Sequence, residues 1–290
     1  MAAGLKAMAR RRAPAQAAGL PASITAPKSD RANLPDLSGT HALIVGVANK
    51  RSIAWAIAQA LSRSGVRIAL TYPSARLEEN VRELAASLDN PLVLPCDVAS
   101  DQQIAELGAA IDGEFGGLDF FVHGAAFARA EELDAPFSQT TREGFRIALD
   151  VSAYSFIALA REVRPLMQKR GGGSMLTLTY LGSKRVFKNY NVMGVAKAAL
   201  EAAVRYLAAE LGADNIRVNA ISAGPIKTLA AMGISGFSSI LGVYRERSPL
   251  GRNIDASEVA DAAVFLLGPG GRAITAEVLM VDAGFHAMGF

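Results

Sequence analysis

Short apolar segments alternate with longer segments of helical periodicity from residue 41 to the end of the chain. Seven of the short segments are nearly continuously apolar, as strands covered on both faces of a sheet are. They span residues 41–46, 67–72, 91–96, 118–123, 174–179, 216–222 and 278–282. Helices are predicted over residues 53–64, 141–168 and 191–211. This alternation predicts βαβ units, and therefore an α/β fold with a seven-stranded parallel sheet in a single doubly wound domain.

The first 37 residues differ from this pattern. They are rich in Ala and Pro, and they hold six Lys or Arg residues against two Asp, a local charge of +4. We predict a flexible basic leader over residues 1–37 and one domain over residues 38–290; an organellar transit peptide, or residues upstream of a true start at Met8 or later, fit the same composition. Because the whole chain carries +3, the domain carries −1. The basic residues therefore give no support to a nucleic-acid partner.

The composition argues against several classes of site. One cysteine, Cys96, cannot form a disulfide framework, and three scattered histidines lack the spacing of metal ligands, so no metal is expected. No run of about 18 uncharged apolar residues occurs, so no membrane-spanning helix is expected. A reducing compartment such as the cytoplasm fits the cysteine count.

The turn after the first predicted strand is a candidate nucleotide site. The strand ends at Gly46, and the chain enters a helix at Ile53. In a Rossmann-type sheet, the pyrophosphate of a dinucleotide meets free backbone N–H groups at this helix end. Only Gly46 remains of the usual G-x-G-x-x-G pattern, and Ser52 stands where a glycine is expected. This segment alone therefore leaves nucleotide binding and an ordinary turn equally open.

The segments after the next two strands bear on the choice of nucleotide. No acid follows the second strand to hold the ribose hydroxyl of NAD, whereas Arg76 could contact the 2′-phosphate of NADPH or simply be solvated. Asp97 ends the third strand, where it could accept a hydrogen bond from the adenine amino group. Helix capping ahead of Ser100 is the alternative role for Asp97.

A tyrosine and a lysine form the strongest candidate for chemistry. Tyr190 and Lys197 are seven residues apart on a predicted helix, so both side chains lie on one face. We expect the ammonium to lower the pKa of the phenol, which makes Tyr190 a usable acid or oxyanion partner. Tyr180 ends the fifth strand and brings a second phenol to the same edge of the sheet. Thr177 lies within that strand and is predicted to be part of the core.

The segment after the sixth strand is a candidate lid. A rigid Gly-Pro turn at residues 224–225 places Thr228 near the same edge of the sheet. Residues 228–250, and residues 232–244 above all, mix Gly, Ser, Met and aromatic side chains. Such a composition suits a mobile cover over an apolar substrate, although an ordinary surface loop is the alternative.

These residues together resemble a known family. Residues 46–54, 180–197 and 218–230 are similar to the short-chain dehydrogenase/reductase superfamily and, within it, to the NADH-dependent enoyl-[acyl-carrier-protein] reductases of bacterial type II fatty acid synthesis. The resemblance covers about residues 38–285. Most members of the superfamily have a catalytic Ser where this chain has Thr177, so the paired tyrosines favour enoyl reduction over carbonyl reduction.

The resemblance implies a reaction and a set of site residues. Hydride would pass from NADH, or from NADPH, to the β-carbon of a trans-2-enoyl thioester on acyl-carrier protein, and the enzyme would be a homotetramer. Implied cofactor contacts are Gly46, Ser52, Ile53, Asp97, Val98, Ala125, Lys197, Ile226, Lys227, Thr228, Leu229 and Ala230. Implied catalytic residues are Tyr180, Tyr190 and Lys197, and implied substrate contacts are Ala128, Met193 and the two tyrosines. Arg245, Arg247 and Arg252 would form a basic rim for the acidic carrier protein.

One segment departs from the family pattern. Family members usually have Ser-Ile after the histidine of the fourth strand, whereas this chain has Gly124 and Ala125 after His123. The smaller side chains predict a wider floor beneath the nicotinamide. A carbonyl reductase that uses Thr177, and a dinucleotide-binding protein without catalytic activity, are the alternatives to an enoyl reductase.

Overall fold

The computed structural model of the chain describes residues 34–232 and 236–289. Within these residues, seven strands form one parallel sheet in the order β3-β2-β1-β4-β5-β6-β7. The strands are β1 (His41–Val45), β2 (Arg67–Tyr72), β3 (Leu92–Pro95), β4 (Phe120–His123), β5 (Gly173–Thr179), β6 (Ile216–Ala223) and β7 (Val278–Val281). All seven predicted strands are present, with ends moved by one or two residues. The predicted fold class is confirmed.

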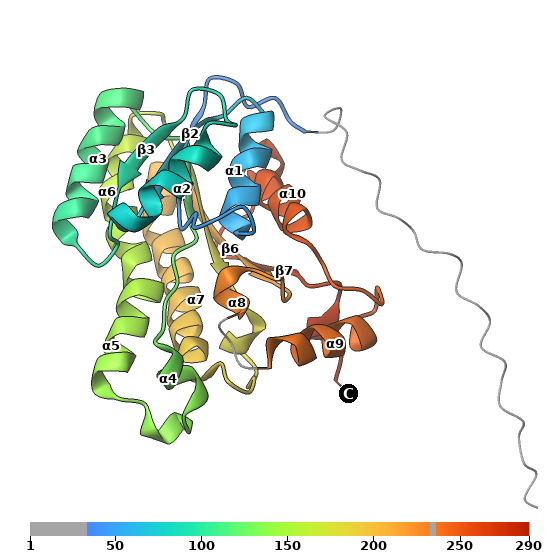
Figure 1. Cartoon of the computed structure of the whole chain (residues 1–290). Helices are drawn as coiled ribbons and strands as arrows, with labels where there is room; N and C mark the ends of the chain where they lie inside the picture. Colours follow the sequence, from blue (N-terminus) through green and yellow to red (C-terminus); the bar gives the residue numbers. More distant parts are fainter. Residues whose placement is uncertain (1–33, 233–235, 290) are drawn as a thin grey trace, which may run out of the picture. The chain divides into compact units, whose positions relative to one another are not determined.

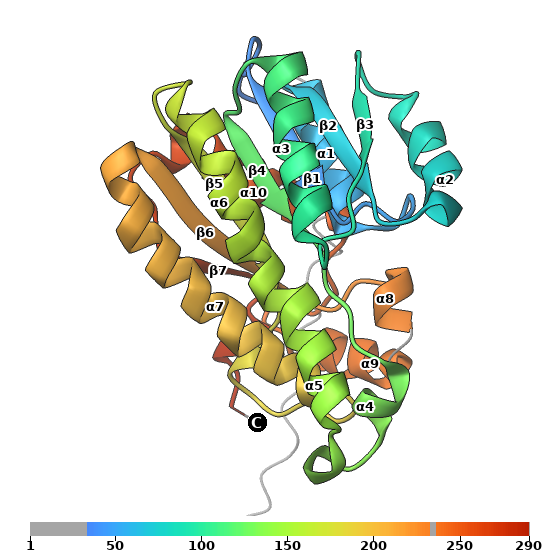
Figure 2. The same cartoon turned by 90° about the vertical axis from the view of Figure 1, so that its left-hand side faces the viewer.

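Helices cover both faces of the sheet. They are α1 (Ile53–Arg63), α2 (Ala75–Ala85), α3 (Asp101–Phe115), α4 (Ala130–Asp134), α5 (Arg142–Leu149), α6 (Ser155–Gln168), α7 (Asn191–Leu211), α8 (Leu229–Met232), α9 (Phe237–Arg247) and α10 (Ala256–Leu267). Helices α3, α6 and α7 pack on one face, and α1 and α10 pack together on the other (Figures 1 and 2). Helices α4, α8 and α9 gather beyond the carboxyl ends of the strands, in the lower part of Figure 2.

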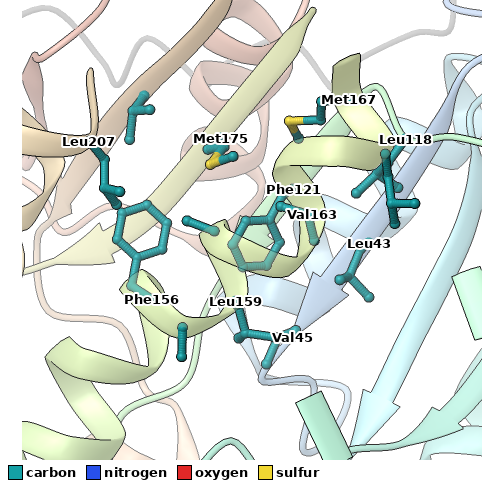
Figure 3. Close-up of a cluster of buried hydrophobic side chains, with 14 of the residues drawn as sticks. Leu43, Val45, Leu118, Phe121, Phe156, Leu159, Val163, Met167, Met175 and Leu207 are labelled. Atoms are coloured by element: carbon teal, nitrogen blue, oxygen red, sulfur yellow. The ribbon is translucent and has the colours of Figure 1, made fainter. Parts of the chain in front are cut away.

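Each strand contributes to two hydrophobic clusters because its side chains alternate between the faces of the sheet. In β1, Leu43 and Val45 join the cluster under α3, α6 and α7. Ala42 and Ile44 join the cluster under α1 and α10. Figure 3 shows the first cluster, with Phe121 of β4 among its fully buried side chains. The nearly continuous apolar runs in the sequence are explained by this double coverage.

The order of the strands reverses direction at β1. From β1 the chain moves outward to β2 and β3, and then returns to place β4 on the other side of β1. Val45 pairs with His123 across this junction, so Gly46 and Gly124 follow side by side. Crevices at such reversals are where ligands bind in doubly wound sheets. The site is therefore expected between the carboxyl ends of β1 and β4.

The helix predicted over residues 141–168 is interrupted. Thr141 caps its start by accepting a hydrogen bond from the Gly144 N–H, but a π-helical turn over Asp150–Tyr154 separates α5 from α6. The Ser155 hydroxyl donates to the carbonyl oxygen of Val151 (2.7 Å) within this turn. π-Helical turns insert one extra residue and often occur near functional sites.

One compact unit begins at Leu34, four residues before the start of the predicted domain at residue 38. Leu37 is buried against the α1 and α10 side of the core, and its N–H donates to the Ser64 carbonyl oxygen (2.7 Å). Residues 1–33 lie outside the described residues, so the leader stays a prediction. Among the helices that the structure describes, none is long and apolar enough to cross a bilayer.

Because the core lies on both faces of the sheet, removing one central aromatic ring should strongly reduce the stability of the fold. Phe121 is fully buried and stacks on Phe156 with ring centroids 6.0 Å apart. Phe121→Ala should lower the free energy of unfolding by about 3–5 kcal/mol, measured by urea denaturation. Phe137→Ala, at a ring that is 52% exposed, is the matched control and should cost under about 1 kcal/mol. Equal losses in the two variants would contradict this packing.

Candidate active site

Two cavities adjoin at the carboxyl ends of the strands. The β1 cavity, about 580 Å³, lies beside Gly46 and Asp97. The tyrosine cavity, about 420 Å³, contains Tyr180 and Tyr190. Six residues line both cavities: Ile53, Gly124, Ala126, Phe127, Leu178 and Thr228. A ligand that occupies one cavity can therefore extend into the other.

The turn after β1 is shaped by a close backbone contact. Gly46 has a φ of +98°, and a Cβ built there would lie 2.4 Å from the Gly124 carbonyl carbon, so a side chain cannot be accommodated. The Ser52 hydroxyl accepts hydrogen bonds from the N–H groups of Ala48 (3.2 Å) and Asn49 (3.1 Å) and thereby closes the turn. Ser52 also occupies the N-cap position of α1, whose first turn contains no acid. This positive helix end faces a cavity that suits an anionic group.

The other wall of the β1 cavity bears on the nucleotide contacts. Asp97 and Val98 line it, as the sequence predicted. The capping role belongs instead to Ser100, which accepts from the Gln103 N–H (3.3 Å) at the start of α3. Arg76 is exposed at the start of α2 and does not line either cavity, whereas the uncharged Thr71, Pro73 and Leu77 line the β1 cavity. The geometry therefore gives no support to Arg76 as a 2′-phosphate ligand.

The packing at Gly124 does not support the part of the predicted widening that concerns this residue, whereas the part at Ala125 stays a prediction. A Cβ built on Gly124 would lie 2.9 Å from the Val45 carbonyl oxygen and 3.1 Å from the Ala54 side chain. The missing side chain at Gly124 therefore lets β4 pack closely on β1 and α1. Ala125 lines the β1 cavity and packs against the core.

The two predicted phenols meet in the tyrosine cavity. Their rings make an edge-to-face contact, with centroids 5.1 Å apart and planes at 71°. Tyr180 follows the last residue of β5, and Tyr190 directly precedes α7. Gly182 makes this approach feasible, because a Cβ there would lie 2.5 Å from the Tyr190 ring. The pairing predicted from the sequence is present.

Lys197 lies on α7, seven residues after Tyr190. Its side chain is buried, lines the same cavity, and donates from Nζ to the Leu178 carbonyl oxygen (2.9 Å). Burial lowers the pKa of Lys197 to about 8, while the nearby Glu201 carboxylate acts in the opposite direction. Glu201 is itself buried and accepts hydrogen bonds from the hydroxyls of Thr179 (2.8 Å) and Ser183 (2.5 Å), on either side of Tyr180.

The expected lowering of the phenol pKa is wrong. Burial raises the pKa of Tyr190 above its ordinary value, and the neighbouring Tyr180 and Glu201 add to the shift. Burial likewise raises the pKa of Tyr180 to about 12. Both hydroxyls are therefore neutral hydrogen-bond donors near neutral pH, because burial disfavours the charged phenolate.

Thr177 is part of a buried network, as predicted for a core residue. The Ser155 hydroxyl donates its one proton to the Val151 carbonyl oxygen. The Ser155 oxygen therefore accepts from Nε2 of His123 (2.8 Å). The Thr177 hydroxyl lies 3.0 Å from Nδ1 and also donates to the His123 carbonyl oxygen (3.1 Å). Burial lowers the pKa of His123 to about 3, which keeps the ring neutral. The Thr177 hydroxyl is thus buried and hydrogen-bonded to His123, so it is not available to a ligand.

Comparison with known proteins agrees with this site. A family model described as enoyl-(acyl carrier protein) reductase matches residues 46–286. The chain is 51% identical over 252 residues to the Bacillus subtilis enoyl-[acyl-carrier-protein] reductase [NADH] FabI, covering 86% of this chain and 97% of that protein. The corresponding [NADPH] protein of Staphylococcus aureus is 46% identical over 248 residues, covering 85% and 96%. The chain belongs to the enoyl-(acyl carrier protein) reductase family.

Solved structures of the family match the fold closely. The Bacillus cereus enzyme, crystallised with NADP⁺ and indole naphthyridinone, has a TM-score of 0.86 at 49% identity and covers 89% of this chain and 100% of its own. The Anaplasma phagocytophilum enzyme, crystallised with NAD, has a TM-score of 0.85 at 44% identity, covering 89% and 97%. The predicted family is confirmed, and with it the class of NAD(P)H-dependent oxidoreductases that act on carbon–carbon double bonds.

The remaining predicted site residues divide into three groups. Ala128, Met193, Ile226 and Thr228 line the tyrosine cavity. Lys227 lines neither of the two cavities and is exposed. Leu229 and Ala230 begin α8, and the structure describes only their backbone.

The predicted lid is largely helical. Helices α8 and α9 occupy most of residues 229–247, and residues 233–235 lie outside the described residues. Phe237 and Ile240 of α9 line the tyrosine cavity, so the lid forms part of its wall. Phe187 also lines this cavity, and the sequence contained no signal for it beyond an aromatic residue between the two tyrosines.

The buried lysine predicts an unusual pH dependence of stability. The folded chain binds the Lys197 proton less tightly than the unfolded chain, for which the ordinary pKa of 10.5 applies. Lys197 therefore destabilises the fold below about pH 8, and this cost disappears as the pH rises towards 10.5. Relative to Lys197→Met, the free energy of unfolding of the wild type should rise between about pH 7 and about pH 10, measured by chemical denaturation. Lys188→Met removes an exposed ammonium and is the control; a pH-independent difference for Lys197→Met would contradict the buried charge.

Proposed function

We propose that this chain reduces the double bond of trans-2-enoyl thioesters carried by acyl-carrier protein, with NADH as the cofactor and NADPH as the alternative. The observation that carries the proposal is the pair of neutral phenols beside Lys197, in a cavity that adjoins a second cavity at the β1–α1 turn. The named relatives include both an [NADH] and an [NADPH] protein, which supports a nicotinamide cofactor of either kind.

The residues of the β1 cavity suit a dinucleotide. The backbone around Gly46 is open to close approach because no side chain intervenes, and the free helix end of α1 suits the pyrophosphate. Asp97 and Val98 would contact the adenine, and Lys197 would donate to the ribose hydroxyls. Ala125 and residues 226–230 would hold the nicotinamide half. When bound, the nicotinamide supplies the hydride that reaches the β-carbon of the substrate.

Tyr190 is proposed as the main polar contact of the thioester. Its hydroxyl stays protonated because burial raises its pKa, so it can donate a hydrogen bond to the thioester carbonyl oxygen as negative charge develops there. Lys197, with its pKa lowered to about 8 by burial, can still hold a proton near neutral pH and stabilise the same charge. Tyr180 would touch the acyl portion beside this oxygen.

The wall of the tyrosine cavity suits an acyl chain. Apart from the tyrosines and Lys197, much of the lining is apolar, including Phe127, Leu133, Met193, Phe237 and Ile240. A mostly apolar cavity with a few polar groups is typical of small-molecule sites.

The rim beside this cavity is proposed to receive the carrier protein. Arg252 is less available than the sequence suggested, because its guanidinium pairs with Glu258 (2.7 Å). Arg245 and Arg247 are exposed at the end of α9, and Lys188 is exposed at the edge of the cavity itself. These cations would attract an acidic partner towards the entrance.

We further propose a homotetramer located in the cytoplasm. Phe145 of α5, Tyr154 of the π-helical turn and Ile157 of α6 are each at least 40% exposed on one side of the molecule. An exposed apolar surface of this kind supports packing against another copy of the chain.

A steady-state assay tests the proposal directly. Purified protein should oxidise NADH or NADPH in the presence of crotonyl and longer trans-2-enoyl thioesters. Measuring both cofactors over a series of chain lengths separates an enoyl reductase from a protein that binds the dinucleotide without turnover. If neither NADH nor NADPH is oxidised with any of the thioesters, the proposal is wrong.

Two substitutions distinguish enoyl reduction from carbonyl reduction. Tyr190→Phe should lower kcat by about 10²-fold, because it removes the donor to the developing oxyanion. Thr177→Val should retain turnover, since that hydroxyl is bound to His123 inside the sheet. A carbonyl reductase that uses Thr177 would show the reverse order of losses. Thermal unfolding of both variants controls for misfolding.

A further inference from the structure

A third tyrosine contacts the catalytic pair. Tyr244 lies on α9 and is 2% exposed, and its hydroxyl donates a hydrogen bond to the Tyr180 hydroxyl oxygen (3.2 Å). Tyr180 lines the tyrosine cavity, whereas Tyr244 does not. Tyr244 therefore approaches Tyr180 from outside the cavity wall.

The Tyr244 ring is held by contacts of its own. It stacks on Phe285 with ring centroids 3.6 Å apart and planes at 17°. Phe285 is fixed in turn by Asp282, which accepts from the N–H groups of Gly284 (3.0 Å) and His286 (2.8 Å). Arg185 donates to the carbonyl oxygens of His286 (2.7 Å) and Met288 (2.9 Å), so the segment cannot move freely. The position of the Tyr244 hydroxyl is thus determined by the C-terminal segment.

The direction of this hydrogen bond has a chemical consequence. A phenol has one proton to donate, and its oxygen can accept as well. Because the Tyr180 oxygen accepts from Tyr244, the Tyr180 proton is left to point into the cavity. Burial raises the pKa of Tyr180 to about 12, and the hydrogen bond from Tyr244 opposes that rise.

We infer that Tyr244 is a positioning residue that orients the Tyr180 hydroxyl as a donor towards the enoyl thioester. The inference rests on the proposed function and deepens it. Tyr244 also lies four residues after Ile240 and seven after Phe237, the two residues of the same helix that line the cavity. The hydrogen bond therefore links the part of α9 that covers the acyl chain to one of the two phenols that touch it.

Tyr244→Phe is the decisive variant, because it keeps the ring on Phe285 and removes only the donor. In the enoyl thioester assay, kcat should fall about tenfold, the value of one hydrogen bond, while KM for the thioester changes little. In the Tyr180→Phe background, the same substitution should have no further effect, since the hydroxyl that Tyr244 orients is gone. Tyr206→Phe removes a phenol hydroxyl from an 81% exposed side chain and is the matched control.

The outcomes distinguish a failure of the proposed function from a failure of the role assigned to Tyr244. A wild-type chain that reduces no enoyl thioester would overturn the proposed function, and the role of Tyr244 with it. An active wild type with an unchanged kcat in Tyr244→Phe would overturn the inference alone. Additive losses in the double variant, or a rise in KM without loss of kcat, would also overturn it, since either shows that Tyr244 acts independently of Tyr180. Circular dichroism and thermal unfolding confirm that each variant is folded.

Discussion

The carboxyl ends of β1 and β4 approach so closely that a Cβ on Gly46 would collide with the Gly124 backbone, and a Cβ on Gly124 would lie 2.9 Å from the Val45 carbonyl oxygen. The rest of the site depends on this backbone contact. It sets the crevice at the point where the strand order reverses, and it directs the turn after β1 into the N-terminus of α1. The two cavities share Gly124 in their walls, so the same contact determines how a ligand passes from one cavity to the other.

Burial decides the protonation states at this site more than the proximity of charges does. Tyr190 precedes α7 and Lys197 lies on it, and both line the tyrosine cavity, yet burial raises the pKa of the phenol and lowers that of the amine. Each shift favours the uncharged form, as a medium of low polarity requires. The two phenols therefore start as neutral hydrogen-bond donors, and they can donate to the substrate oxygen as negative charge develops there.

Much of the fold followed from the sequence because strands buried on both faces leave continuous apolar runs, as in residues 41–46. Tyr190 and Lys197 could be paired for a similar reason, since both lie on one helix. Contacts between distant segments could not be read in this way. Tyr244 reaches Tyr180 across 64 residues, and the close packing at Gly124 depends on Val45 and Ala54, which belong to other elements. The pKa of Tyr190 was misjudged because spacing along a helix contains no information about burial.

The π-helical turn between α5 and α6 restricts how the chain can change in length. Its extra residue allows Ser155 to reach His123 (2.8 Å), while Ser152 accepts from the Phe127 N–H (2.9 Å) in the loop after β4. Deleting one residue would restore a regular α-helix, but it would rotate everything after the deletion by about 100° and turn one of these serines away. An insertion or deletion in this turn therefore changes which side chains reach the floor of the site. The length of this helix is therefore as much a part of the active site as the residues that line it.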